Sequence, residues 1–565
     1  MVEASTDDAR GATMTALRRT GGLALLTTAL LATTLAAPPA LAAGAPAQVD
    51  APVPVLDWQP CGPGLEPFLC TSAEVPRDYD RPNGATTTIA LTLLPASGDP
   101  AERVGTLFTN PGGPGGSGVE FVQQAGPYIY HPDVLARFDV LGFDPRAVAG
   151  SDPATCFRTA EDEASSPLLA QAYPITPREE VRYTLESLAL ATRCQVTSPV
   201  RFATASTANV ARDMDLLRQA VGDEELYYAG YSYGTFLGAT YARLFPERVG
   251  RFLLDATVDP VAWTGTGAGD AAPSVPLGIR IRQGLGAHET FGEFTRLCAE
   301  AGPATCPLAA LGDPATVAYE TFDRLATQPV EVPLPDGTSV LVTQQVAVAS
   351  TFQSLYSPSL WPDLAALIAA LAAPVPDPAA VASAGAGTRS ALGARLRGED
   401  YPSIGGGLAS LCVDTASNGR VDRYPRLIDA YDQTAPYFGR FRGWVALPCE
   451  TWPIQDHDAF TGPWQQTTTA PVLVVGTRFD PATPYQQTQP YRDLFPAGHL
   501  LTLDGWGHTA LGKSVCVDEH IATYLVTGAP PADGTVCAPD AVPFATAPGA
   551  RVAPRIDVPP GLPFW

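Results

Sequence analysis

Basic residues are scarce in this 565-residue sequence, and their scarcity excludes one class of partner. Lysine and arginine together number 35 against 58 aspartates and glutamates, so the formal net charge is −23. Such an acidic chain repels the phosphate backbone of nucleic acids and anionic membrane surfaces. We therefore expect no nucleic-acid partner. Hydrophobic residues make up 45% and charged residues 16%, which provides a sizeable core and excludes a disordered chain.

Metal-binding patterns are also missing. The six histidines are scattered and the ten cysteines form no C-x-x-C pair, so a zinc site is not expected. The cysteines instead fall as close neighbours along the chain. An even count behind an export signal favours disulfides, with sequential pairing as the simplest topology, although the sequence leaves the connectivity open. The neighbouring pairs are Cys61/Cys70, Cys156/Cys194, Cys298/Cys306, Cys412/Cys449 and Cys516/Cys537.

The apolar run near the N-terminus is too short for a convincing membrane span. It covers Leu23–Ala36, follows Arg18 and Arg19, and precedes the small residues Ala40-Leu41-Ala42. This pattern is typical of a cleaved export signal. We therefore predict that residues 1–42 are a signal peptide, and that the mature protein is secreted without stable membrane insertion.

Apolar strand-like runs recur along the rest of the chain, and each ends in turn residues. Several are apolar on both faces, as in parallel strands covered by helices, and helical segments such as Ala208–Val221 intervene. This alternation predicts an α/β fold with a doubly wound, mostly parallel sheet. The predicted strands are Thr88–Leu94, Val104–Thr109, Phe138–Phe143, Leu226–Ala229, Phe252–Leu254, Val472–Val475 and Leu500–Leu503.

The alternation stops between about Trp263 and Cys449, where helical segments and a Pro/Ala/Gly-rich passage stand between core strands. An insertion that returns to a core strand is best interpreted as a largely helical cap over the active site, with an independent second domain as the alternative. The predicted divisions are a first core part at 43–262, a cap at 263–449, a second core part at 450–545 and a Pro-rich tail at 546–565.

The strongest local signal is Gly230-Tyr231-Ser232-Tyr233-Gly234, a G-x-S-x-G sequence that follows an apolar strand and opens a helical pattern. The glycines let the strand turn sharply into the helix, which holds the serine hydroxyl at the strand's carboxyl end. An ordinary turn is the alternative, but the strand before the motif and the helix after it favour catalysis. Ser232 is therefore the predicted nucleophile.

A second glycine-rich segment, Asn110–Gly118, directly follows the predicted strand Val104–Thr109. Its backbone N–H groups can approach a substrate oxygen, so we expect an oxyanion hole formed by Gly113 and Tyr233. A phosphate-binding loop fits less well, because no Gly-Lys-Ser/Thr follows and the dinucleotide spacing is poorly met. A merely flexible turn is the other alternative.

A nucleophilic serine needs a base, and the base needs an acid that orients it. Asp480 follows one predicted strand and His508 follows the next, each at the strand's carboxyl end. The chain order Ser, Asp, His is that of α/β-hydrolases. Asp504 competes with Asp480 but lies in the same short turn as His508, where a capping role suits it better. The predicted triad is Ser232, His508 and Asp480, and its chemistry needs no metal or organic cofactor.

Longer blocks around these residues resemble secreted bacterial tripeptidyl aminopeptidases of the α/β-hydrolase superfamily, which are related to proline iminopeptidases. The resemblance covers nearly the whole mature chain. It implies a serine exopeptidase that releases short peptides, such as tripeptides, from free N-termini, and it supports the Cys412/Cys449 and Cys516/Cys537 bridges. The matching blocks are Asn110–Gly118, Phe138–Arg146, Gly230–Gly234, Ala409–Asp414, Cys449–Trp452, Asp480–Pro484, Gly507-His508 and Ser514–Cys537.

The sequence departs from this family at one loop. Members usually carry Arg-Gly-x-Gly after an Asp-Pro pair, whereas Arg146 is followed here by Ala147-Val148-Ala149-Gly150. The departure allows a different loop conformation beside the pocket and leaves the triad unaffected.

Exopeptidases of this kind bind the substrate's ammonium group with carboxylates of the cap or rim, a charge-assisted contact that also measures the distance to the scissile bond. By position, Asp414 is the first candidate and Glu450 the second, although both could equally be solvated or structural acids. Fold and triad do not set the substrate, so a carboxylesterase or lipase-like hydrolase is one alternative to a peptidase. A non-catalytic binding module is another.

Overall fold

The computed structural model describes residues 48–168, 171–334, 337–388 and 404–545. The chain divides into two compact units, residues 1–44 and 45–565, and every described residue lies in the second unit. The predicted signal peptide and the predicted Pro-rich tail lie outside the described residues.

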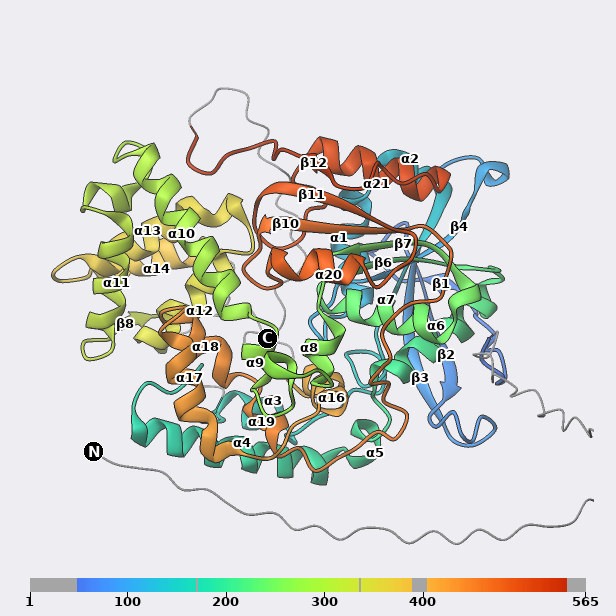
Figure 1. The fold of residues 1–565 in the computed structure, drawn as a ribbon, viewed down its shortest axis with the longest axis horizontal. Coiled ribbons are helices and arrows are strands. Elements are labelled where there is room, and N and C mark those ends of the chain that lie inside the picture. Colours follow the sequence, from blue (N-terminus) through green and yellow to red (C-terminus); the bar gives the residue numbers. More distant parts are fainter. Residues whose placement is uncertain (1–47, 169–170, 335–336, 389–403, 546–565) are drawn as a thin grey trace, which may run out of the picture. The chain divides into compact units, whose positions relative to one another are not determined.

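A ten-stranded sheet forms the core and confirms the predicted α/β class (Figure 1). The strand order is β1-β2-β3-β5-β4-β6-β7-β10-β11-β12, with antiparallel pairing from β1 to β5 and parallel pairing from there to β12. The strands are β1 (Gln59–Pro60), β2 (Leu69–Pro76), β3 (Thr86–Leu94), β4 (Gly105–Asn110), β5 (Phe138–Phe143), β6 (Leu226–Tyr231), β7 (Val249–Asp255), β10 (Val472–Phe479), β11 (Gly498–Trp506) and β12 (Thr535–Cys537). All seven predicted strands are present.

Helices cover both faces of this sheet, because successive residues of the central strands point to opposite sides. In β10, Val472 and Val474 pack into one apolar cluster, whereas Leu473 and Val475 pack into another. The first cluster includes residues of α6 (Thr207–Val221), α7 (Tyr233–Leu244) and α20 (Thr488–Arg492). The second includes residues of α1 (Gly118–Ile129), α2 (Pro132–Arg137) and α21 (Val515–Thr527).

The chain between β7 and β10 is largely helical, as predicted, and we keep the name cap for residues 263–449. Large cap side chains such as Phe291, Trp361 and Trp444 belong to one apolar cluster, which also includes residues outside the cap such as Tyr183 and Phe236. The helices from β7 onward are α8 (Pro260–Thr264), α9 (Leu277–Arg280), α10 (Gln283–Ala301), α11 (Pro314–Leu325), α12 (Gln344–Ser354), α13 (Trp361–Ala372), α14 (Pro378–Ala386), α16 (Gly405–Asp414), α17 (Tyr424–Asp432), α18 (Phe438–Trp444) and α19 (Leu447–Glu450). A hairpin of β8 (Val330–Pro333) and β9 (Ser339–Val342) stands among them.

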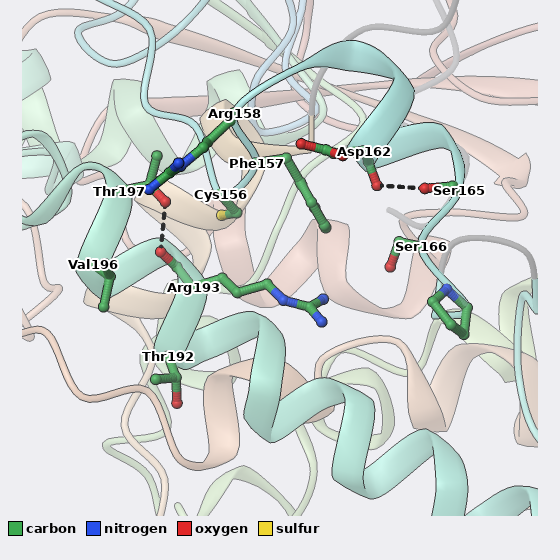
Figure 2. A pocket seen from close by; sticks show the side chains of 11 residues that line it. Cys156, Phe157, Arg158, Asp162, Ser165, Ser166, Thr192, Arg193, Val196 and Thr197 are labelled. Carbon is green, nitrogen blue, oxygen red and sulfur yellow. Dashed lines mark hydrogen bonds between the residues drawn. The ribbon is translucent and has the colours of Figure 1, made fainter.

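Three further helices, α3 (Ala160–Ala164), α4 (Pro177–Thr197) and α5 (Pro199–Phe202), precede α6. Helix α4 packs against the cap: Arg440 pairs with Glu180 at 2.8 Å, and the Tyr183 ring meets Trp444 edge-on at 5.8 Å. A cavity of about 480 Å³ lies between α3 and α4, where Phe157 and Arg193 point toward one another (Figure 2). None of the predicted triad residues lines this cavity, so it is separate from the candidate active site.

The ten cysteines form five disulfides between sequence neighbours. One of them joins α16 to α19 within the cap, and another joins α21 to β12 at the edge of the sheet. The bonded pairs are Cys61–Cys70, Cys156–Cys194, Cys298–Cys306, Cys412–Cys449 and Cys516–Cys537.

Candidate active site

Ser232 occupies the sharp turn between β6 and α7, with φ 55° and ψ −124°. Few residues with a side chain adopt this backbone conformation, and it persists only where surrounding contacts impose it. The Ser232 N–H donates to the carbonyl of Asp255 on β7 at 3.0 Å, and the Ser232 carbonyl accepts from the Thr235 N–H at 2.8 Å. Ser232 thus stands at the carboxyl edge of the sheet, where the motif predicts it.

The glycine-rich loop after β4 packs directly against this turn. A Cβ atom on Gly112 would lie 2.4 Å from the Tyr231 carbonyl oxygen and 2.9 Å from Ser232 Cβ, so no side chain fits there. Gly113 follows, and its loop lies beside Tyr233, the first residue of α7. N–H groups in the first turn of a helix lack intrahelical acceptors and favour negative charge. The two predicted oxyanion-hole residues therefore belong to segments that both adjoin Ser232.

His508 and Asp480 form a buried pair at the neighbouring strand ends. His508 Nδ1 lies 2.9 Å from Asp480 Oδ2 and 3.0 Å from Oδ1, and the two residues are 4% and 2% exposed. Asp480 also accepts hydrogen bonds from the Ala482 N–H at 2.8 Å, the Thr483 N–H at 2.9 Å and the Thr483 hydroxyl at 3.0 Å. Burial alone would raise the pKa of Asp480, but the charge of His508 and these hydrogen bonds lower it below its usual value. The carboxylate is therefore held ionised against the imidazole.

The competing acid Asp504 faces elsewhere. Its side chain is 59% exposed and pairs with Arg478, whose Nε lies 3.4 Å from Asp504 Oδ1. Of the other histidines, His499 lies at the start of β11 and His520 lies within α21. Among the residues that the structure describes, Asp480 is thus the carboxylate hydrogen-bonded to the His508 ring.

The cap contacts the loop of His508 directly. The Tyr356 carbonyl, just after α12, accepts a hydrogen bond from the His508 N–H at 2.9 Å, and the Tyr356 ring meets the His508 ring edge-on at 4.8 Å. The start of α10 also touches the acid loop, because a Cβ on Gly286 would lie 2.7 Å from the Asp480 carbonyl oxygen. The sequence gives no local signal for Tyr356, since its contact joins segments far apart in the chain.

The first candidate for binding a substrate ammonium, Asp414, is 2% exposed and ends helix α16. Its carboxylate accepts from the Thr207 hydroxyl at 2.5 Å and from the Thr207 N–H at 3.1 Å. The Tyr233 hydroxyl in turn donates to the Thr207 oxygen. Asp414 therefore connects the cap to the residue that follows Ser232. Burial raises the pKa of Asp414 to about 7 despite the hydrogen bonds from Thr207.

The second candidate, Glu450, is 8% exposed and lies on α19, which the Cys412–Cys449 disulfide joins to α16. Its carboxylate accepts a long hydrogen bond, 3.5 Å, from the Tyr424 hydroxyl. Burial raises the pKa of Glu450, and the charge of Arg280 opposes that effect. The disulfide thus holds the two candidate acids on neighbouring cap helices.

The loop in which the sequence departs from the related family packs beside α16. Ala147 and Ala149 take φ values of 69° and 40°, a conformation that glycine adopts more readily than alanine. A Cβ on Gly406 of α16 would lie 3.2 Å from the Ala147 carbonyl oxygen. Both alanines therefore adopt a backbone conformation that is typical of glycine. Their loop contacts the cap at Ala147.

One cluster of metal-ligand side chains occurs among the described residues, namely Cys516, His520 and Cys537. Its two cysteines are joined in a disulfide, so they offer no thiolate ligand. In the same part of the chain, no helix is both long and apolar enough to cross a membrane.

Two family models match the chain: one described as alpha/beta hydrolase fold over residues 105–280, and one described as TAP-like protein over residues 435–537. Serine protease Hip1 of Mycobacterium tuberculosis is 33% identical over 518 residues, which cover 85% of this chain and 91% of Hip1. Tripeptidyl aminopeptidase of Streptomyces coelicolor is 28% identical over 500 residues, covering 86% and 87%. Carboxylesterase B of Mycobacterium tuberculosis is 33% identical over 529 residues, covering 89% and 95%.

Proposed function

The chain is a serine hydrolase of the α/β-hydrolase family, related to the TAP-like proteins, and we propose that it is a secreted exopeptidase. On this proposal it releases short peptides, such as tripeptides, from free N-termini, using Ser232, His508 and Asp480. Peptides are its substrates. The proposal is supported by relatives named serine protease and tripeptidyl aminopeptidase, each matched over most of its length.

The observation that carries the mechanism is the buried His508–Asp480 pair, with its 2.9 Å contact from Nδ1 to Oδ2. A carboxylate at Nδ1 fixes the tautomer in which Nε2 can accept a proton. His508 then takes the proton of the Ser232 hydroxyl as Ser232 attacks the scissile carbonyl. The N–H groups of Tyr233 and Gly113 stabilise the oxyanion, and His508 protonates the leaving amine. Water, activated by His508, hydrolyses the acyl-enzyme.

Two variants that differ only in which acid they neutralise test this mechanism. Asp480→Asn should lower kcat by about 10⁴-fold, because it removes the acceptor that fixes the His508 tautomer. Asp504→Asn should leave kcat within about twofold, because Asp504 is exposed and pairs with Arg478. A fluorophosphonate probe should label Ser232 in the wild-type protein and not in Ser232→Ala. Equal losses in the two aspartate variants, or labelling that survives in Ser232→Ala, would refute the triad.

The preference for a free N-terminus is a further part of the proposal, with Asp414 first and Glu450 second as the groups that bind the ammonium. Free-amino tripeptide anilides should be cleaved in preference to their N-acetylated counterparts and to single-residue anilides. Asp414→Asn should remove that preference. If it does not, Asp414 serves instead as the buried partner of Thr207, and Glu450→Gln is the next variant to measure.

A carboxylesterase is the second candidate function, and the match to Carboxylesterase B favours keeping it. Ester hydrolysis uses the same nucleophile, base and oxyanion hole, so the triad does not separate the two activities. Short-chain nitrophenyl esters assayed beside the anilides make the distinction. Cleavage of esters alone would assign the esterase activity and reject the peptidase.

Secretion is the remaining part of the proposal. The five disulfides support it, since such bonds form and persist in oxidising compartments. Expression of the full chain in a secreting bacterial host, followed by N-terminal sequencing of the protein in the medium, tests both export and cleavage near residue 42. Retention of the uncleaved chain in the cytoplasm would contradict the proposal.

A further inference from the structure

Asp255 is a buried acid that the proposed mechanism does not use. It ends β7, the strand between β6 and β10, and is 0% exposed. Its backbone carbonyl accepts the Ser232 N–H at 3.0 Å, so Asp255 fixes one side of the turn that carries the nucleophile.

The Asp255 side chain reaches in another direction, to the loop that carries His508. Oδ2 accepts from the Ala510 N–H at 2.9 Å and from the Leu511 N–H at 3.1 Å, and Oδ1 lies 3.0 Å from the Ala510 nitrogen. An ionised carboxylate is an acceptor only, and bonds from N–H groups to a charged oxygen are stronger than neutral ones. One residue thus contacts the backbone on both the nucleophile side and the base side.

The His508 loop depends on such anchors because its own backbone is unusual. Thr509 takes φ 65°, a conformation that a β-branched residue rarely adopts. The Lys513 ammonium donates to the carbonyls of His508 and Thr509, the latter at 2.8 Å. Carbonyls of the loop are therefore held by Lys513, and N–H groups of the loop are held by Asp255.

We infer that Asp255 is a positioning residue for catalysis, whose carbonyl and carboxylate together set the position of Ser232 relative to His508. This inference rests on the proposed triad. In the described part of the chain, the His508 ring is hydrogen-bonded to Asp480 and not to Asp255, so Asp255 acts through the loop and not as a second acid of the triad.

The energetics agree with a positional role. Burial raises the pKa of Asp255 to about 6, and the hydrogen bonds from Ala510 and Leu511 only partly oppose that effect. Desolvating a carboxylate is unfavourable, and a neutral side chain of similar volume would be cheaper to bury. Titratable groups whose pKa is strongly perturbed by burial cluster at functional sites, and the Asp255 carboxylate is in addition directed at two backbone N–H groups.

The test compares Asp255→Asn with Asp223→Asn at pH 8. Asp223 is a matched control, because it is a half-buried aspartate that accepts the Thr106 N–H at 2.8 Å at the opposite edge of the sheet. The readouts are kcat, KM, hydrogen exchange of the peptide covering residues 507–512, and labelling of Ser232 by a fluorophosphonate probe. Asp255→Asn turns one acceptor into an amide donor that faces an N–H group.

We expect Asp255→Asn to lower kcat by about 10- to 100-fold, to keep KM within about twofold and to speed exchange at residues 507–512. Asp223→Asn should change none of these. If Asp255→Asn does not fold, Asp255→Ser, which leaves room for water, is measured in its place. Unchanged kcat in a folded variant, or a loss of kcat without faster exchange at 507–512, overturns the inference while the triad stands. A wild-type protein that does not label at Ser232 refutes the triad, and this role with it.

Discussion

The carbonyl oxygen of Tyr356 lies 2.9 Å from the backbone nitrogen of His508 and accepts its N–H. Tyr356 belongs to the cap, whereas His508 follows the core strand β11. The same tyrosine places its ring against the imidazole at 4.8 Å. A cap that merely covered the site would not need to bind the backbone of the proposed base. Displacement of the cap should therefore alter the geometry of His508.

Gly507 offers a direct test of this contact. A Cβ on Gly507 would lie 2.6 Å from the Tyr356 carbonyl oxygen and 2.7 Å from Pro358 Cδ, so Gly507→Ala must push the cap away from His508. We expect kcat to fall by about 10- to 100-fold in a steady-state assay.

Gly512→Ala is the matched control for this prediction. Gly512 lies in the same loop with φ 79°, but nothing stands within 4 Å of an added Cβ. Both variants carry the strain of alanine at positive φ, about 1–2 kcal/mol each. Gly507→Ala should lose more stability in thermal unfolding, because it alone also clashes with the cap. If Gly512→Ala lost as much activity as Gly507→Ala, backbone strain would explain the effect and the cap contact would not.

The hydrogen bond from Thr483 should contribute to catalysis by stabilising the ionised carboxylate of Asp480, the proposed acid of the triad. Its hydroxyl donates to Asp480 Oδ2 at 3.0 Å, so Thr483→Val removes one hydrogen bond from the carboxylate and keeps the side-chain shape. We expect a loss of about 1–2 kcal/mol of transition-state stabilisation, measured as a fall in kcat/KM of about 5- to 30-fold. Thr477→Val is the control on β10, the strand that leads into the Asp480 loop, because the Thr477 hydroxyl is buried with no hydrogen-bond partner among the described residues. That variant should keep its activity and lose no stability.

The sequence predicted the parallel centre of the sheet well because its signals are local. Runs such as Val472–Val475 are apolar throughout, and each predicted strand ends in turn residues. The same reasoning predicts Ser232, Asp480 and His508 as the site residues, since each follows the carboxyl end of a predicted strand. The carboxyl ends of neighbouring parallel strands meet at one edge of the sheet, so motif order alone indicated which residues could approach each other.

Contacts between distant segments left no such signal. Strand β2 alternates and contains Cys70 and Pro76, so its pairing with β3 is decided by the partner strand and not by its own pattern. The links from Tyr356 to His508 and from Asp255 to Ala510 join segments that only the folded chain brings together. A buried aspartate at the end of an apolar strand is indistinguishable in sequence from an exposed turn residue. The role of Asp255 therefore needed the structure.

The buried carboxyl of Asp414 predicts a pH dependence of stability. Burial raises its pKa from 3.8 to about 7, so the folded protein holds this proton more tightly than the unfolded chain does. The stabilisation from Asp414 is thus complete below pH 4 and is lost as the pH rises to about 7. Asp414→Asn stays neutral at every pH and removes this slope. In thermal unfolding from pH 4 to pH 8, the variant should gain stability relative to the wild type as the pH rises. A difference that does not change with pH would show that Asp414 is ionised throughout.

We expect that replacing Ala149 by glycine, in the loop that departs from the related family, stabilises the protein. Its φ of 40° places an exposed alanine on a glycine-like backbone, where an L-residue costs about 1–2 kcal/mol. Glycine removes that strain but gives back about 0.5–1 kcal/mol through the greater freedom of the unfolded chain. Ala149→Gly should therefore raise stability by up to about 1 kcal/mol in denaturant unfolding.

Replacing an exposed alanine inside a helix by glycine should have the opposite effect on stability. Ala299 lies in α10, where replacement by glycine should cost about 1 kcal/mol. Because both sites are exposed and lose one methyl group, the comparison separates backbone conformation from packing. If both variants are destabilised equally, the alanine at position 149 is not strained. If Ala149→Gly stabilises the protein and Ala299→Gly destabilises it, as expected, the loop keeps a conformation suited to glycine although the sequence has alanine there. The contacts of Asp144 explain why, because its carboxylate accepts the Gly150 N–H at 2.9 Å and the Ser117 hydroxyl at 2.6 Å and so fixes the loop.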